Sequence, residues 1–133
     1  MRYLLDTNIC IYLMKRQPPE VTARFATLAF GDVGMSSITL AELRFGVEVS
    51  PRRRQDEAAL DDLLQDVMAM PFEHTAAQEY GRLRALVRSR QRDALDRLIA
   101  AHAASLNCTL VTNNEPDFAG YPGLTVENWA RPA

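Results

Sequence analysis

Short apolar runs alternate along the chain with longer segments of helical periodicity. Apolar runs bounded by polar or turn residues predict strands, and apolar side chains spaced three or four residues apart predict amphipathic helices. The predicted strands are residues 2–5, 33–36, 67–72, 108–112 and 124–129. The predicted helices are residues 8–16, 20–30, 39–49, 57–66, 75–90 and 95–105.

This alternation predicts one domain spanning residues 1–133. Strands that are separated by helices need crossover connections, which favour a parallel sheet with helices on both faces. We therefore expect an α/β protein, a three-layer α/β/α sandwich with a central parallel sheet. Locally, Thr39 and Glu42 have the spacing of a capping box, SPRRRQDE predicts a polar link, and TNNEPDF predicts a turn.

Composition narrows the classes of protein. The formal net charge is −2, so any surface that attracts nucleic acid has to be local. Cys10 and Cys108 lie in apolar runs without a CxxC motif, which is typical of reduced, buried thiols. The sequence has no apolar stretch near the roughly 18 residues of a membrane span and no signal-peptide pattern. We therefore expect a soluble, cytoplasmic protein that does not associate with a membrane.

Four acidic residues lie where the predicted strands end or where the next helix begins. Ligands of open parallel sheets bind outside the carboxyl ends of the strands, so acids from distant segments can meet there. Carboxylates in such a cluster repel one another unless a cation neutralises them, and Mg²⁺ or Mn²⁺ is the natural occupant of a site made of oxygen ligands. The four acids are Asp6, Glu42, Asp96 and Asp117.

Each acid also has a structural explanation. Asp6 has the position of an N-cap, Glu42 completes a capping box, Asp96 favours a helix dipole, and Asp117 suits a turn. The joint placement of the four after successive strands favours the functional interpretation. Polar side chains that could orient a carboxylate or a phosphate lie at the same expected edge; they are Asn8, Thr112 and Asn113.

Several motifs together resemble the PIN domain and, within it, the VapC-type toxins of bacterial toxin–antitoxin pairs. They are LLDTN, SSITLAELRFG, DRLIAAHA, LVTNNEPDF and the closing YPGLTVENW, in the family's order. The resemblance implies a small α/β/α sandwich and metal-dependent cleavage of RNA. It implies that Asp6, Glu42, Asp96 and Asp117 are the catalytic acids. It also implies an antitoxin encoded alongside and, usually, a homodimer.

The chain departs from many relatives before the third acid. They carry a loop containing Gly and Pro there, whereas this chain has RSRQRDALD, so Asp93 is an alternative to Asp96. Asp96 is preferred because it begins the LIAAHA segment.

The proposed chemistry needs no nucleophilic side chain. Asp6 and Asp96 would hold Mg²⁺, and Glu42 and Asp117 would complete its shell or position a second ion. Activated water would then attack the phosphorus and leave 5′-phosphate and 3′-hydroxyl ends. Arginines that precede Asp96 are candidates to hold RNA phosphates: Arg82, Arg84, Arg88 and Arg92. His102 is expected in the core and His74 at the surface.

Two other functions remain open. A binding protein could occlude RNA or a ribosome through its arginines, with the acids only capping helices. Within the nuclease class, DNA is an alternative substrate, because nothing in the sequence reads a 2′-hydroxyl. Phosphatases and receiver domains that use an aspartate after the first strand also need a late lysine, whereas the single lysine here is Lys15.

Overall fold

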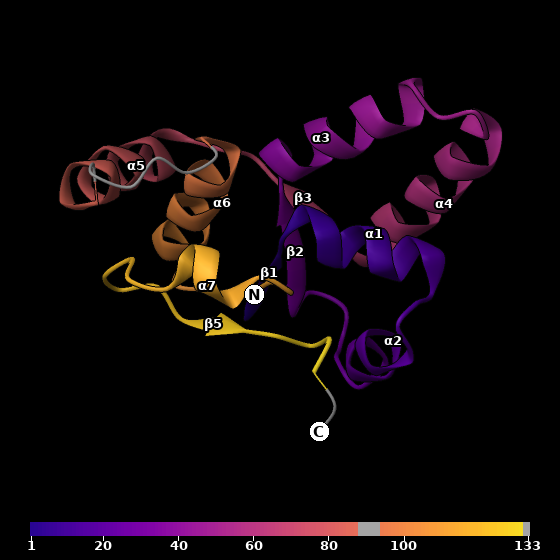
Figure 1. Ribbon diagram of the computed structural model, residues 1–133, viewed down its shortest axis with the longest axis horizontal. Helices are drawn as coiled ribbons and strands as arrows, with labels where there is room; N and C mark the ends of the chain where they lie inside the picture. Colours follow the sequence, from indigo (N-terminus) through magenta and orange to yellow (C-terminus); the bar gives the residue numbers. More distant parts are fainter. Residues whose placement is uncertain (88–93, 132–133) are drawn as a thin grey trace.

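The computed structural model describes residues 1–87 and 94–131 as a parallel sheet between two layers of helices (Figure 1). The strands are β1 (Tyr3–Leu5), β2 (Val33–Ser36), β3 (Met68–Met70), β4 (Thr109–Val111) and β5 (Val126–Glu127). The helices are α1 (Thr7–Lys15), α2 (Pro19–Ala26), α3 (Ser37–Glu48), α4 (Arg53–Asp66), α5 (His74–Leu86), α6 (Ala94–Ser105) and α7 (Glu115–Phe118).

All paired strands are parallel, in the order β3-β2-β1-β4-β5. This confirms the predicted α/β/α sandwich and the edge position of the last strand. The first strand is the centre of the sheet, because Leu5 pairs with Met35 of β2 on one side and Val111 of β4 on the other. Its three residues are all buried, as expected for a strand covered on both faces.

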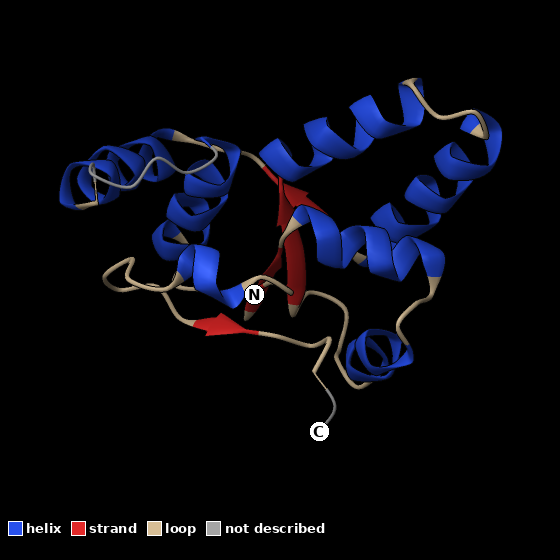
Figure 2. Ribbon diagram, viewed as in Figure 1, coloured by secondary structure: helices blue, strands red, loops and turns tan. Residues whose placement is uncertain are grey.

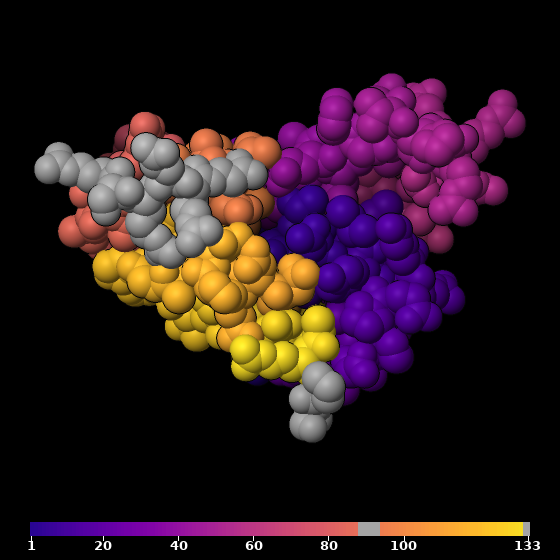
Figure 3. Space-filling view, viewed as in Figure 1, coloured from indigo at the N-terminus to yellow at the C-terminus, as the bar shows by residue number. Residues whose placement is uncertain are grey.

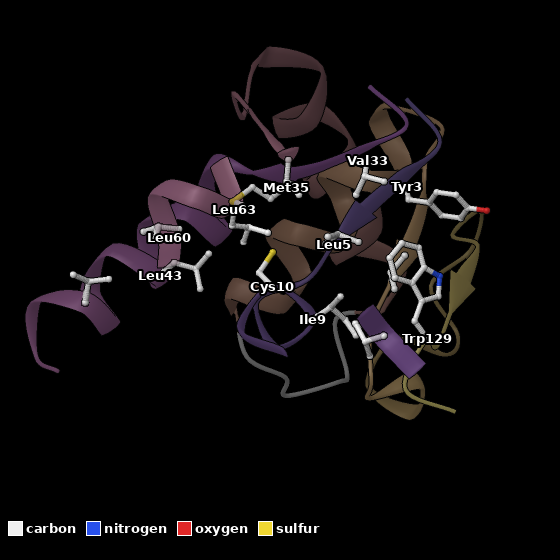
Figure 4. Close-up of a cluster of buried hydrophobic side chains, with 14 residues drawn as sticks. Tyr3, Leu5, Ile9, Cys10, Val33, Met35, Leu43, Leu60, Leu63 and Trp129 are labelled. Atoms are coloured by element: carbon white, nitrogen blue, oxygen red, sulfur yellow. The ribbon is translucent and has the colours of Figure 1, made fainter. Parts of the chain in front are cut away.

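Helices cover both faces of the sheet (Figure 2). Helices α1, α2, α3 and α4 contribute to one buried cluster, which includes Leu5, Leu43 and Leu60 (Figure 4). Helices α5, α6 and α7 contribute to a second cluster, which includes Leu4 and Ile99. Alternate residues of β1 therefore anchor opposite layers, as the two-residue period of a strand requires.

Two predicted helix starts were wrong. Helix α3 begins at Ser37, and the Ser36 hydroxyl accepts a hydrogen bond from the Ile38 amide, so the N-cap is Ser36. Thr39 is buried one turn later and cannot form the predicted capping box with Glu42. Helix α4 begins at Arg53, so most of the stretch predicted as a polar link is helical.

Three further predictions need adjustment. Residues 20–30 were predicted as one helix, but α2 ends at Ala26 and a turn closed by an Asp32–Ala29 hydrogen bond follows. The predicted turn TNNEPDF contains the short helix α7. Helix α5 ends at Leu86, and residues 88–93 lie outside the described part of the chain. Cys10 and Cys108 are both buried and free.

None of the helices in the described ranges has the length and apolar character that crossing a bilayer requires.

Candidate active site

The first strand delivers Asp6 to the carboxyl edge of the sheet. The Asp6 amide donates to the Val111 carbonyl at 2.9 Å, so its backbone still follows the ladder between β1 and β4. Its side chain is the N-cap of α1 and accepts from the Ile9 amide at 2.9 Å. Asp6 therefore has the structural role that its sequence position indicates, and this role fixes the carboxylate at the edge where ligands bind.

The Asp6 carboxylate is buried at an electrostatic cost. Its residue is 7% exposed. The pKa of Asp6 is raised to about 6: burial is the main cause, the negative charge of Glu42 adds to it, and hydrogen bonds from Thr112 and Ile9 offset part of the rise. Within the described residues, neither Asp6 nor Glu42 forms an ion pair with an arginine or lysine. The two carboxylates thus share a region of negative potential, and a bound cation would lower its energy.

Glu42 is held by a residue of the first helix rather than by its own helix terminus. The Thr7 hydroxyl donates to Glu42 Oε1 at 2.6 Å and so links α1 to α3. Both residues line a surface cleft of about 530 Å³, whose other lining residues are Ile38, Ala41, Phe45 and Leu95. The cleft therefore combines a carboxylate with an apolar wall.

A chain of hydrogen bonds runs from Asp6 towards Asp117. Thr112, which is fully buried, bonds to the Asp6 carboxylate and accepts from the Asn114 amide at 3.0 Å. The Asn114 side chain in turn donates to Asp117 Oδ2. Asp117 is half-buried on α7. The segment after β4 therefore connects Asp117 to Asp6 through hydrogen bonds.

The asparagines predicted at this edge lie side by side. Asn113 donates from Nδ2 to the Tyr12 hydroxyl at 2.8 Å, and Asn8 reaches Asn113 Oδ1 at 3.4 Å, which is long for a hydrogen bond. The two contacts join α1 to the loop after β4. Asn8 and Asn113 therefore hold the two backbone segments that carry Asp6 and Thr112.

Asp96 lies in the first turn of α6 and is half-buried. Its neighbour Leu95 lines the same cleft as Thr7 and Glu42, so the start of α6 faces the middle of α3. Asp93, the alternative third acid, lies outside the described residues.

The donor set suits a hard cation held by few protein ligands. Among the described residues, no three His, Cys, Asp or Glu side chains are grouped so that they could hold a metal ion together. Mg²⁺ is usually held by one or two carboxylates and retains several waters, so it does not need three acids in direct contact. The buried Asp6 carboxylate, which has no cationic partner among residues 1–87 and 94–131, is the feature that fits such an ion.

The predicted arginines are only partly described. Arg82 and Arg84 are exposed on α5; Arg82 forms an ion pair with Glu79, and Arg84 lies over the Tyr80 ring. The pairing with Glu79 offsets part of the charge that Arg82 could offer to RNA. Arg88 and Arg92 lie outside the described residues. His102 is buried and hydrogen-bonded to Ser36, as predicted for a core histidine, and His74 is exposed as predicted.

Sequence reasoning missed two residues of this region. Thr7 was part of a quoted motif but had no assigned role, and Tyr12 was not singled out. Their partners lie 35 and 101 residues away in the sequence, at Glu42 and Asn113. No local pattern signals such long-range side-chain pairs.

Comparison with known proteins gives a consistent result. Residues 3–124 match the model of the PIN domain. The chain is 38% identical to Ribonuclease VapC2 of Rickettsia felis, covering 97% of this chain and 98% of the relative. It is 34% identical to the tRNA(fMet)-specific endonuclease VapC of Shigella flexneri, covering 98% of this chain and 99% of the relative.

Solved structures agree with the sequence matches. The structure of VapBC2 from Rickettsia felis, bound to a DNA fragment from its promoter, contains a chain that superposes with a TM-score of 0.90 at 37% identity. The match covers 97% of this chain and 99% of that one.

Proposed function

The chain belongs to the PIN domain family, and on that premise we propose that it is a metal-dependent endoribonuclease acting as the toxin of a toxin–antitoxin pair. The observation that carries the proposal is the buried Asp6 carboxylate at the end of the central strand, with Glu42 nearby and no cationic side chain paired with it in the described chain. Relatives of nearly the same length are named ribonucleases and a tRNA endonuclease.

Each acid has a proposed role. Asp6 and Asp96 hold a Mg²⁺ ion, for which Mn²⁺ can substitute, and Glu42 and Asp117 complete the site. When bound, the ion supplies positive charge that offsets the charge of the reacting phosphate and promotes the ionisation of water. The Thr112 side chain orients the Asp6 carboxylate through their hydrogen bond.

Other polar side chains orient this edge of the sheet. Thr7 holds the Glu42 carboxylate through its 2.6 Å hydrogen bond. Asn8 and Asn113 hold α1 against the loop after β4. The arginines of α5 and of the following segment are proposed to hold RNA phosphates, an interaction that weakens as salt increases.

The proposed protein partner is an antitoxin of the VapB type, because structurally similar chains come from VapBC complexes. A groove of about 230 Å³ between α1, α3 and α4 offers it a place to bind. Its apolar lining includes Ile11, Met14 and Val47, and Glu42 lines both this groove and the cleft. A partner in this groove therefore reaches the candidate site directly. We also propose that the toxin forms a homodimer.

One experiment tests the enzymatic proposal. The purified chain is incubated with a mixed RNA pool, with Mg²⁺ or with EDTA, and the cut ends are mapped. Cleavage that requires Mg²⁺ and leaves 5′-phosphate ends is expected, and Asp6→Asn should reduce its rate at least about 100-fold, since charge stabilisation by a metal contributes several kcal/mol.

The matched control is Asp62→Asn, an exposed acid on α4 that should leave the rate unchanged. Cleavage that persists in EDTA, or ends that carry a 2′,3′-cyclic phosphate, would contradict the metal-dependent route. An Asp6→Asn variant that inhibits translation as well as the parent chain would favour the RNA-occluding protein instead. Cleavage of DNA in place of RNA would correct the substrate class.

A further inference from the structure

Ser36 and His102 form a buried polar contact between α3 and α6. The Nδ1 atom of His102 lies 2.7 Å from the Ser36 hydroxyl oxygen, and the two residues are 1% and 0% exposed. Ser36 is the N-cap of α3, and His102 belongs to α6, which lies beside the start of α3 (Figure 1). The contact therefore joins the helix that carries Glu42 to the helix that carries Asp96.

The hydrogen bonds around this contact define the protonation of the ring. The Ser36 oxygen accepts from the Ile38 amide at 3.1 Å, so its own hydrogen is available to donate to His102 Nδ1. The backbone of Pro71 also bonds to the ring, and because proline has no N–H, its carbonyl must be the acceptor. This pattern fits the neutral tautomer with its proton on Nε2, and burial lowers the pKa of His102.

The turn between β3 and α5 also packs against the contact between Ser36 and His102, through Phe72. The Phe72 amide donates to the Ser37 hydroxyl at 3.0 Å, and the Phe72 ring packs edge-on against the His102 ring, with centroids 5.4 Å apart. The Ser36 hydroxyl therefore contacts the Ile38 amide and the His102 ring, and the His102 ring contacts Ser36 and the backbone of Pro71. A satisfied, buried polar network favours one arrangement of the elements that it joins.

The contact lies at a fixed distance from two of the candidate acids. Glu42 follows Ser36 by six residues and Asp96 precedes His102 by six, so each acid is about 9 Å along its helix from the contact. Near the acids, Glu42 of α3 and Leu95 of α6 both line the 530 Å³ cleft. The two helices therefore meet at Ser36 and His102, and residues of both line the cleft.

We propose that the contact between Ser36 and His102 is a positioning element that sets the separation of Glu42 and Asp96, and thereby the affinity of the site for a divalent cation. The inference rests on the proposed function. Neither side chain faces the cleft, so both act through the placement of the two helices. Residues that orient metal-binding groups typically change metal affinity 10- to 100-fold when they are replaced.

The test compares three variants of the full chain by calorimetric titration with Mn²⁺. His102→Leu removes both ring hydrogen bonds, and His102→Asn retains an acceptor oxygen near the position of Nδ1. Ile99→Ala is the control for lost stability, because Ile99 is 1% exposed in the same helix. His102→Leu is expected to weaken Mn²⁺ binding about tenfold, while His102→Asn and Ile99→Ala stay within about twofold of the parent.

Two outcomes would overturn the proposal: unchanged Mn²⁺ affinity in His102→Leu, or equal losses in His102→Leu and Ile99→Ala. Absence of Mn²⁺ binding by the parent chain would instead overturn the proposed metal dependence, and this inference with it. The distinction is visible before any variant is compared.

A second measurement uses the parent chain alone, so a folding defect in a variant cannot affect it. Nitrogen-15 NMR of the parent chain at neutral pH reports which ring nitrogen of His102 carries the proton. We expect a protonated Nε2 and an unprotonated Nδ1 that accepts from Ser36. A ring that populates both tautomers equally would have no fixed hydrogen bond to Ser36 and would overturn the proposal.

Discussion

The two ends of the central strand β1 differ in whether the charged side chain beside them has a partner of opposite charge. At its start, Arg24 donates a hydrogen bond to the Tyr3 hydroxyl at 3.0 Å and forms an ion pair with Glu127 at 3.7 Å. Its guanidinium carbon lies 5.5 Å from the ring centroids of Tyr3 and Trp129. Glu127 and Trp129 belong to the C-terminal segment, which is yellow in Figure 3. At its end, three residues later, Asp6 is buried beside the negative charge of Glu42.

The difference separates a structural end from a binding end. The Tyr3 end gains from aromatic packing, a cation over two rings and a paired carboxylate, all of which stabilise the folded chain without a ligand. The Asp6 end keeps a carboxylate that ionises less readily than in the unfolded chain, and a bound cation would favour its ionised form. The proposed site therefore lies at the end of β1 where burial of a charge costs stability.

The largest test of this comparison is the removal of the indole at the structural end. Trp129 is 4% exposed and packs against Tyr3 with ring centroids 5.4 Å apart. Trp129→Ala should lower the free energy of unfolding by about 3–5 kcal/mol, the usual cost of emptying such a site. Urea denaturation measures the change.

The same variant should retain the Mn²⁺ affinity of the parent at a temperature where it is folded. A parallel loss of Mn²⁺ affinity would show that the two ends are coupled, and the division between them would be wrong.

Asp6→Asn tests the binding end, and its effect on stability depends on pH. The folded-state pKa of about 6 lies above the ordinary aspartate pKa of 3.8, so the folded chain binds the extra proton between these values and loses stability as pH rises through them. Asparagine can still cap α1. Without metal, Asp6→Asn should therefore be more stable than the parent at pH 8, by at most about 3 kcal/mol, and similar to it near pH 3.5.

Thermal or urea unfolding at several pH values in EDTA measures this difference. Saturating Mg²⁺ should reverse it at pH 8, because only the parent gains stability from the ion. If the variant is less stable than the parent at pH 8 without metal, the Asp6 charge is compensated in the folded chain and the comparison fails.

The sequence predicted the architecture better than the contacts within the site. Apolar runs such as LLD and CTLVT fix where buried strands lie, and the alternation with helices leaves few topologies for a parallel sheet. Asp6 could be found because it follows a strand directly. The ends of helices were harder to predict: Thr39 and Glu42 mimic a capping box, whereas the capping hydroxyl belongs to Ser36.

Contacts between distant side chains were not predictable. The contact of Thr7 with Glu42 and that of Ser36 with His102 span 35 and 66 residues, and each depends on the packing of two helices. A serine before a helix indicates a cap in the sequence, but nothing local indicates which histidine its hydroxyl reaches. Such pairs follow from tertiary packing, which periodicity does not encode.

The smallest expected effect on stability comes from the hydrogen bond between Thr7 and Glu42. Thr7→Val keeps the shape of the side chain and removes the hydroxyl that donates to Oε1 at 2.6 Å. Because Glu42 is partly exposed, water can replace the lost donor, and the free energy of unfolding should change by less than about 1 kcal/mol.

The carboxylate of Glu42 loses its fixed orientation in Thr7→Val, so cleavage in Mg²⁺ should slow about tenfold, as for other residues that orient metal-binding groups. Thr7→Ser, which keeps the hydroxyl, should cleave at nearly the parent rate. Equal rates for the valine and serine variants would mean that Glu42 needs no partner, and that Asp6 by itself makes this end of β1 different from the other.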